Sequence, residues 1–291
     1  MKRIIIPLLL FLILHPSSFA ASTIDTNNPY AYGANVGWLN WYADAGTNGA
    51  VIGEFYCSGY IYSANVGWIS LGASNGPANG YMYSNLSSND WGVNNVGGGQ
   101  LSGMAYGANI GWITFEQTYG QPRVDLLTGN LTGYAYSANC GWISLSNAFA
   151  FAQTDTVSPG QLDANGLPIA WELQYFGTTN INPNADPDGD GMSNAQEYQA
   201  GTNPFDPNDR LRITAISANS AGSTSIVTWT SHASRLYQVE SRDSLVTGSW
   251  STNLPPGLVS PDVGLTTTRS IPGAVSTQRF FRVQVIHPLS P

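Results

Sequence analysis

Tyr32-Gly-Ala-Asn-Val-Gly-Trp38 is the first of four copies of the motif Tyr-x-Ala-Asn-x-Gly-Trp, and the others span 62–68, 106–112 and 136–142. The residues around each turn, such as Trp-Ile-Ser-Leu, belong to types that favour β-strands. Between them, Ala-Asn-x-Gly suits a four-residue loop, because Asn tolerates turn geometry and Gly adopts a positive φ without a Cβ clash. Each copy therefore predicts a β-hairpin.

The four hairpins must pack against one another. A single hairpin cannot bury its own aromatic face, so several have to stack or close. We therefore predict one all-β hairpin-repeat domain over residues 21–147. The sequence leaves open whether this domain closes as a barrel or a propeller or remains an open stack.

The first twenty residues have the organisation of a signal peptide. A basic start, Met1-Lys2-Arg3, precedes an apolar run over 4–14, and Ser18-Phe19-Ala20 provides small residues for cleavage after Ala20. A buried strand is the alternative, but the N-terminal position favours export. No second apolar run reaches spanning length, so we expect a secreted or cell-surface protein with no transmembrane segment in the mature chain.

Charge argues against nucleic acid as a partner. The chain has 10 Lys and Arg residues against 18 Asp and Glu residues. Loss of Lys2 and Arg3 with the signal peptide leaves eight arginines against these 18 acidic residues, a formal net charge of −10. Such a surface repels nucleic acid and anionic lipid.

The two cysteines, Cys57 and Cys140, match no zinc-binding spacing. An oxidising compartment favours a disulfide between them. Two buried free thiols are the alternative.

The remainder of the chain separates into a linker and a second β domain. Residues 148–209 are predicted to hold two short helices. One lies within 167–177, with Pro168 in its first turn and Gly177 at its end, and the other spans 193–200 and is ended by Gly201. Residues 210–291 alternate like strands between Gly, Pro and Ser clusters, which predicts an immunoglobulin- or fibronectin-III-like β-sandwich. The expected fold class is mainly β.

The segment Asp186-Pro-Asp-Gly-Asp-Gly-Met-Ser-Asn-Ala-Gln-Glu197 predicts a metal site. Ca²⁺ prefers six to eight oxygen ligands, and a twelve-residue calcium loop supplies them from positions 1, 3, 5, 7, 9 and 12. Carboxylates this close repel one another without a cation, so we expect Ca²⁺ rather than a plain acidic turn. The predicted ligands, in loop order, are Asp186, Asp188, Asp190, the Met192 carbonyl, Asn194 and Glu197.

This EF-hand-like loop differs from a true EF-hand. Pro183 and its neighbouring asparagines prevent a helix from running directly into it. It is similar instead to the single loops of thrombospondin type 3 repeats and dockerins, which favours a structural ion over a signalling switch. Just beyond the second helix, three more polar residues either add ligands or only form part of a turn: Asn203, Asp206 and Asp209.

The stretch 166–204 resembles a cassette of secreted bacterial surface proteins, notably of the verrucomicrobial type. It joins Gly166-Leu-Pro-Ile-Ala-Trp-Glu-Leu-Gln-Tyr-Phe-Gly177 to the acidic loop and to Tyr198-Gln-Ala-Gly-Thr-Asn-Pro204. In such proteins a β-sandwich often follows, ending in a strand like Phe281-Arg-Val283, and the N-terminal motif resembles repeats of similar exported proteins. The resemblance implies calcium binding and an extracellular location. It does not imply an enzymatic reaction.

An enzyme is not expected. No catalytic motif includes His232 or His287, the two histidines of the mature chain. Glycoside hydrolysis needs a carboxylate pair, and the sequence pairs none of the repeat domain's acidic residues. These are Asp44, Glu54, Asp90, Glu116 and Asp125.

Two other functions remain, and they use different residues. A carbohydrate-binding module needs exposed rings. The motif residues Trp38, Trp68, Trp112 and Trp142 recur in register and are predicted to pack in the core. The candidates for sugar binding are then Trp41, Tyr42, Trp91 and Tyr119. A structural or adhesive protein that meets glycans, matrix or cell-surface proteins needs no pocket, and this is the function that we expect.

Overall fold

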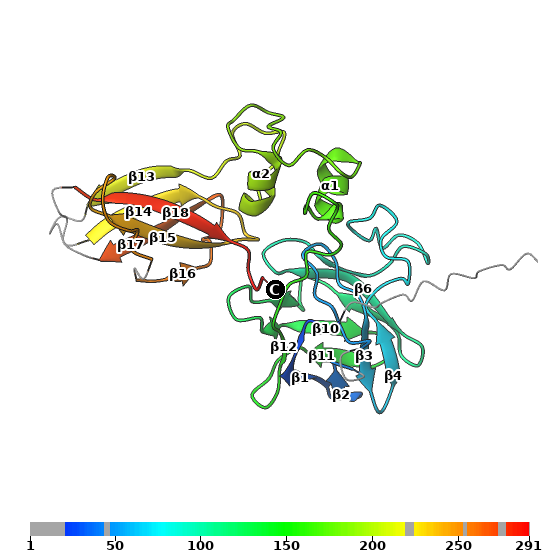
Figure 1. Cartoon of the computed structure of the whole chain (residues 1–291). Helices are drawn as coiled ribbons and strands as arrows, with labels where there is room; N and C mark the ends of the chain where they lie inside the picture. Colours follow the sequence, from blue (N-terminus) through cyan, green and yellow to red (C-terminus); the bar gives the residue numbers. More distant parts are fainter. Residues whose placement is uncertain (1–20, 44–46, 219–223, 253–254, 273–277, 291) are drawn as a thin grey trace, which may run out of the picture.

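The computed structural model describes residues 21–43, 47–218, 224–252, 255–272 and 278–290. The predicted signal peptide, residues 1–20, lies outside the described residues, as does Asp44. An N-terminal barrel, two short helices and a C-terminal sandwich follow one another along the chain (Figure 1). The protein is mainly β, as predicted. Within the described ranges, no helix is long and apolar enough to cross a bilayer.

Eight antiparallel strands form a closed barrel, which was one of the arrangements that the sequence left open. Neighbouring hairpins pair in order, and the last strand pairs back with the first, where Tyr32 lies opposite Ser144. The first and last motifs of the sequence are thus neighbours in space. The four hairpins are β1 (Ile24–Gly33) with β2 (Gly37–Asn40), β3 (Tyr60–Ser63) with β4 (Gly67–Ser70), β6 (Leu101–Gly107) with β7 (Gly111–Phe115), and β10 (Tyr134–Ser137) with β11 (Gly141–Ser144).

Among the described residues, two shorter strands, β5 (Val93–Asn95) and β12 (Ala152–Thr154), extend the barrel sheet, and two others, β8 (Arg123–Val124) and β9 (Leu131–Thr132), form a separate two-stranded sheet. β5 pairs with β6, β8 pairs with β9, and β12 pairs with the start of β1. β12 lies beyond residue 147, so the barrel includes residues that the predicted boundary gave to the linker.

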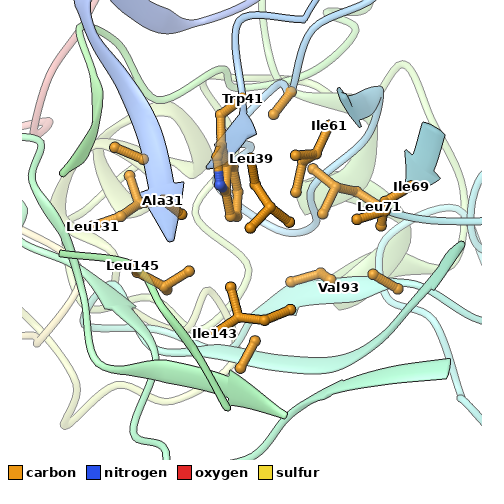
Figure 2. Close-up of a cluster of buried hydrophobic side chains, with 14 of the residues drawn as sticks. Ala31, Leu39, Trp41, Ile61, Ile69, Leu71, Val93, Leu131, Ile143 and Leu145 are labelled. Atoms are coloured by element: carbon orange, nitrogen blue, oxygen red, sulfur yellow. The ribbon is translucent and has the colours of Figure 1, made fainter. Parts of the chain in front are cut away.

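One apolar pair from each hairpin fills the barrel. Trp41 also lies inside, with its ring centroid 6.4 Å from that of Phe115. Figure 2 shows apolar side chains from several strands converging on this core. Because side chains alternate along a strand, the residues next to these must face outward. The buried pairs are Ala31 with Leu39, Ile61 with Ile69, Ala105 with Ile113, and Ala135 with Ile143.

The motif asparagines bind the four turns to one another. Each donates a hydrogen bond from Nδ2 to the carbonyl oxygen of the residue that follows the asparagine in an adjacent turn. Since Asn35 of the first turn bonds to the last turn, the bonds form a closed circle, which we call the asparagine ring. Its four bonds are Asn65 to Val36 (3.0 Å), Asn109 to Val66 (3.1 Å), Asn139 to Ile110 (3.0 Å) and Asn35 to Cys140 (3.0 Å).

The predicted disulfide is wrong. Cys57 and Cys140 are both free and buried. Cys140 occupies the turn position that Val or Ile holds in the other three copies of the motif. Its thiol therefore packs as a small apolar group. An oxidising compartment permits a disulfide, but it does not by itself bring two cysteines together.

Two three-stranded sheets form the C-terminal sandwich. β14 (Thr224–Thr230) lies between β13 (Ile213–Ala218) and β17 (Thr266–Pro272), and β15 (Leu236–Arg242) lies between β16 (Leu258–Val259) and β18 (Phe280–Ile286). Trp229 of β14 and Tyr237 of β15 are buried, and their ring centroids are 5.9 Å apart. These two rings thus form the centre of the sandwich core.

The helices α1 (Ile169–Phe176) and α2 (Asn194–Ala200) lie between the barrel and the sandwich (Figure 1). Each ends at a glycine in the left-handed conformation, Gly177 with φ 66° and Gly201 with φ 76°. Both helices and both stops follow the sequence prediction.

Candidate metal centre in the loop 186–197

Hydrogen bonds to its own backbone shape the acidic loop. Asp186 accepts the amides of Gly189 (2.8 Å) and Gly191 (2.9 Å), while Asp188 and Asp190 each accept the amide two residues further on. The two glycines have φ values of 77° and 98°, which other residues rarely adopt. As a result, carboxylate oxygens of Asp186, Asp188 and Asp190 lie within 4.8 Å of one another.

Helix α2 positions the last two predicted ligands. Ser193 and Gln196 form a capping box at its start, with the Ser193 amide donating to Gln196 Oε1 at 2.8 Å. Asn194 donates from Nδ2 to the Asn182 carbonyl at 2.8 Å, which leaves its Oδ1 for another partner. Glu197 lies in the first turn of α2 and is 1 % exposed.

Several buried oxygens of this loop have no hydrogen-bond partner among the described residues: Asp188 Oδ2, Asp190 Oδ2, Asn194 Oδ1, and both carboxylate oxygens of Glu197. Buried polar atoms are normally satisfied, so such a cluster needs an explanation. The atoms belong to loop positions 3, 5, 9 and 12, and oxygen is the donor that Ca²⁺ prefers. The residues present therefore fit a calcium ion, which would supply a positive charge shared by these oxygens.

The carboxyl groups differ in their electrostatic surroundings. The pKa of Glu197 is raised to about 7, mainly by burial and to a smaller extent by the charges of Asp190, Asp188 and Asp209. Burial also raises the pKa of Asp188. Desolvation acts the same way on Asp186, but the amides of Gly191 and Gly189 outweigh it and lower the pKa of that carboxyl. Asp186 is thus held charged, whereas Glu197 needs a cation or a proton near neutral pH.

The polar residues beyond α2 cap turns. Asn203 Oδ1 accepts the Phe205 amide, and Asp206 Oδ1 accepts the amide of Asn208. Asp209 accepts the Asn203 amide and pairs with His232 Nε2 at 2.7 Å. Of the two roles that the sequence allowed for these residues, the structure shows turn formation.

Next to the loop, a polar cluster connects all three parts of the protein, and we call it the joint. Arg235 of the sandwich segment is 3 % exposed and pairs with Glu54 of the barrel domain at 2.8 Å. Arg235 also donates to the carbonyls of Tyr198 (2.6 Å) and Gln199 (3.0 Å) at the end of α2. Tyr198 donates its hydroxyl to Glu54 at 2.9 Å, and its ring centroid lies 4.8 Å from that of His287.

The predicted sugar-binding rings are scattered. Trp41 is 2 % exposed inside the barrel, so the prediction that it binds sugar is wrong. Tyr42 is half-buried against the same core. Trp91 packs on the Trp112 ring at 5.1 Å, and Tyr119 is 81 % exposed.

The motif tryptophans, predicted to pack in the core, lie on the outside of the barrel instead. They are 43–50 % exposed, and each ring lies 4.9–5.0 Å from the tyrosine opposite it in its hairpin. Strand alternation in the sequence already predicts this: if the residue before the motif Tyr and the Ile or Leu after Trp face inward, Tyr and Trp must face outward. We call these rings the aromatic belt: Tyr32, Trp38, Tyr62, Trp68, Tyr106, Trp112, Tyr136 and Trp142.

The acidic residues considered for hydrolysis have local partners. Asp90 accepts the amides of Ala78 and Ser84, Glu116 accepts those of 118–120, and Asp125 accepts those of Leu127 and Thr128. Glu54 belongs to the joint. These carboxylates therefore shape turns or connect domains.

Comparison with known proteins identifies one part of the chain. Residues 186–207 match the family model described as the bacterial TSP3 repeat. This repeat coincides with the loop and α2, and it supports the thrombospondin type 3-like character predicted for them. No curated protein and no solved structure matches the chain.

Proposed function

We propose that this protein is an extracellular, calcium-binding modular protein in which the ion fixes the position of the sandwich relative to the barrel. The single observation that carries the proposal is the run of unsatisfied oxygens ending at Glu197, one residue before Tyr198 of the joint. An ion held by Glu197 stabilises the first turn of α2. The other end of this short helix holds the carbonyls that Arg235 binds.

A second contact leads from the loop to the sandwich. Arg210 donates from Nη1 to the Asp190 carbonyl at 3.1 Å, close to where β13 begins. Folding of the loop around an ion is therefore coupled both to the joint and to the sandwich. A structural role at the cell surface, in which the barrel and the sandwich present their surfaces to matrix or to other cells, follows from such a fixed arrangement.

The ion is tested by thermal unfolding of the full chain with and without a chelator. We expect chelation to lower the melting temperature of the wild type by much more than that of Asp186→Ala/Glu197→Ala. The double variant Asn203→Ala/Asp206→Ala, which changes turn residues, should still respond to chelation. If calorimetry detects no calcium uptake by the wild type, the proposed function is wrong.

Carbohydrate binding is a second candidate, and the aromatic belt is the observation that favours it. Its rings are accessible, and apart from Asp25 the eight barrel strands contain no charged residue. Aromatic faces pack well against the apolar faces of sugars, and an uncharged surface suits an uncharged polyhydroxylated ligand. The fourfold repetition would give several equivalent contacts on one barrel.

A glycan array with the full chain tests this second candidate. Trp68→Ala and Trp142→Ala should each weaken sugar binding, whereas Phe149→Ala should not, because Phe149 is a highly exposed ring outside the belt. Removing an exposed ring from such a pair should cost only about 0.5–1.5 kcal/mol of stability, so the variants remain folded. Equal binding by all three variants, or no binding by the wild type, would remove the belt as a sugar site.

A further inference from the structure

The segment 161–172 has the same organisation as the calcium loop that follows it. When Glu172 is aligned with Glu197, Asp163 and Asn165 fall at positions 3 and 5, and Gly166 falls at position 6. Helix α1 then begins at position 9, as α2 does. Gly166 has a positive φ of 84°, as Gly191 does at the same loop position.

The likeness continues through both helices. The last residue of each loop begins the sequence Glu-x-Gln, at 172–174 and 197–199. Each helix then ends at a left-handed glycine followed by threonine, at 177–178 and 201–202. The two loop–helix units are therefore organised alike, with α1 one residue longer than α2, and we call them the first and the second copy. The family match covers only the second copy.

Glu172 is the feature of the first copy that points to a ligand. Its side chain is fully buried, at 0 % exposure, although carboxylates rarely are. One oxygen, Oε1, accepts the Ile181 amide at 2.9 Å, while Oε2 is buried without a partner among the described residues. The carboxyl lies against that of Asp163. A buried oxygen that faces a second carboxylate needs a cation or a proton.

Hydrogen bonds to neighbouring residues hold the other possible ligand residues in place. Asp163 Oδ1 accepts the amides of Asn165 (2.8 Å) and Leu167 (2.9 Å). The Asn165 side chain donates from Nδ2 to the Ile181 carbonyl at 3.1 Å. Thus Asn165 and Glu172 are both anchored at residue 181, and Asp163 lies against Glu172.

We propose that the loop 161–172 is a second calcium site, held by the carboxylates of Asp163 and Glu172 with the side-chain oxygens of Gln161 and Asn165. It has two carboxylates where the loop 186–197 has four, so it binds Ca²⁺ more weakly. The Leu167 carbonyl, at position 7, already accepts the Asp163 amide at 2.8 Å, which weakens the site further. A dissociation constant of roughly 10⁻⁴ to 10⁻³ M, typical of extracellular modules, is expected.

Equilibrium dialysis of the full chain against Ca²⁺ tests the proposal. The wild type should bind two ions in separate steps. Glu172→Gln should lose only the weak step, and Glu197→Gln should lose only the tight step. Gln161→Asp/Asn165→Asp restores acidic residues at positions 1 and 5, and it should tighten the weak step roughly tenfold or more. Circular dichroism confirms that each variant is folded.

The outcomes separate this site from the first one. A wild type that binds one ion, lost in Glu197→Gln, overturns the second site and leaves the proposed function intact. No binding at all overturns both. A weak step that survives in Glu172→Gln but disappears in Asp206→Asn places the second ion at the turn beyond α2 and overturns the proposal. If Gln161→Asp/Asn165→Asp binds no tighter, Asp163 and Glu172 share a proton instead of a cation.

Discussion

At the scale of single residues, Glu197 shows why a buried carboxylate would depend on the proposed calcium ion. Removing a carboxylate from water without a partner is unfavourable, so the folded chain keeps this group neutral or pairs it with a cation. Asp186, which accepts two backbone amides, is stabilised in its charged form. We therefore expect calcium and protons to compete mainly at Glu197.

This competition predicts a pH dependence of stability. Burial raises the pKa of Glu197 from its ordinary 4.5 to about 7, so between these values the calcium-free folded state holds a proton that the unfolded state releases. In chelator, the melting temperature should fall as pH rises through this window. The increase in melting temperature that calcium produces should grow over the same window, because the ion replaces the proton.

Differential scanning calorimetry at several pH values measures both trends. In chelator, Glu197→Gln should show a flatter profile than the wild type between about pH 5 and pH 7, since glutamine does not titrate. Identical profiles for the two proteins would show that another group binds the proton.

At the scale of elements, each hairpin depends on the next through the asparagine ring. The Asn side chain acts as a donor between turns rather than within its own turn. This explains why the motif requires Asn, whereas Asp, an equally good turn residue, does not appear at these positions.

Asn65→Asp tests the ring. Aspartate keeps the turn but loses the donor and places its charge against the Val36 carbonyl, so we expect a loss of roughly 1–3 kcal/mol in the free energy of unfolding. Asn147→Asp is the matched control, because Asn147 uses only its Oδ1, as acceptor of the amides of Phe149 and Ala150. Urea denaturation measures both, and equal effects would contradict a role for the ring.

The elements that the sequence predicted are those with local causes. The hairpins follow from turn residues, the helices from Pro168, Gly177 and Gly201, and the loop from the order of its oxygens. Closure of the barrel was not predictable, because it depends on β11 returning to β1. Recurrence of the motif tryptophans predicted a place in the core, which is wrong because strand alternation decides the face on which a side chain lies.

At the scale of the whole molecule, the joint brings together residues that no local pattern connects. Glu54, Tyr198 and Arg235 come from three different parts of the chain. The acidic loop could be found from the sequence because its residues share one segment. The sequence did not predict this cluster, which exists only once the barrel, α2 and the sandwich are assembled.

Arg235→Gln tests whether the joint holds the domains together. It leaves Glu54 and the end of α2 without their shared cation, so the sandwich should move more freely, and roughly 3–5 kcal/mol of interaction is lost. Small-angle scattering should show a broader distribution of overall dimensions. Arg269→Gln removes an ion pair with Asp262 inside the sandwich and serves as control. A scattering curve unchanged by Arg235→Gln would show that other contacts hold the domains.

The pairing of β11 with β1 also sets the order of events during folding. Until the fourth hairpin is available, the first three present two free strand edges, which are open to pairing with other chains. Contacts between segments so distant in sequence form slowly compared with those of a helix or a single hairpin. The barrel therefore closes only when its last repeat is available, and loss of any one hairpin leaves two strands unpaired, with a tendency to aggregate.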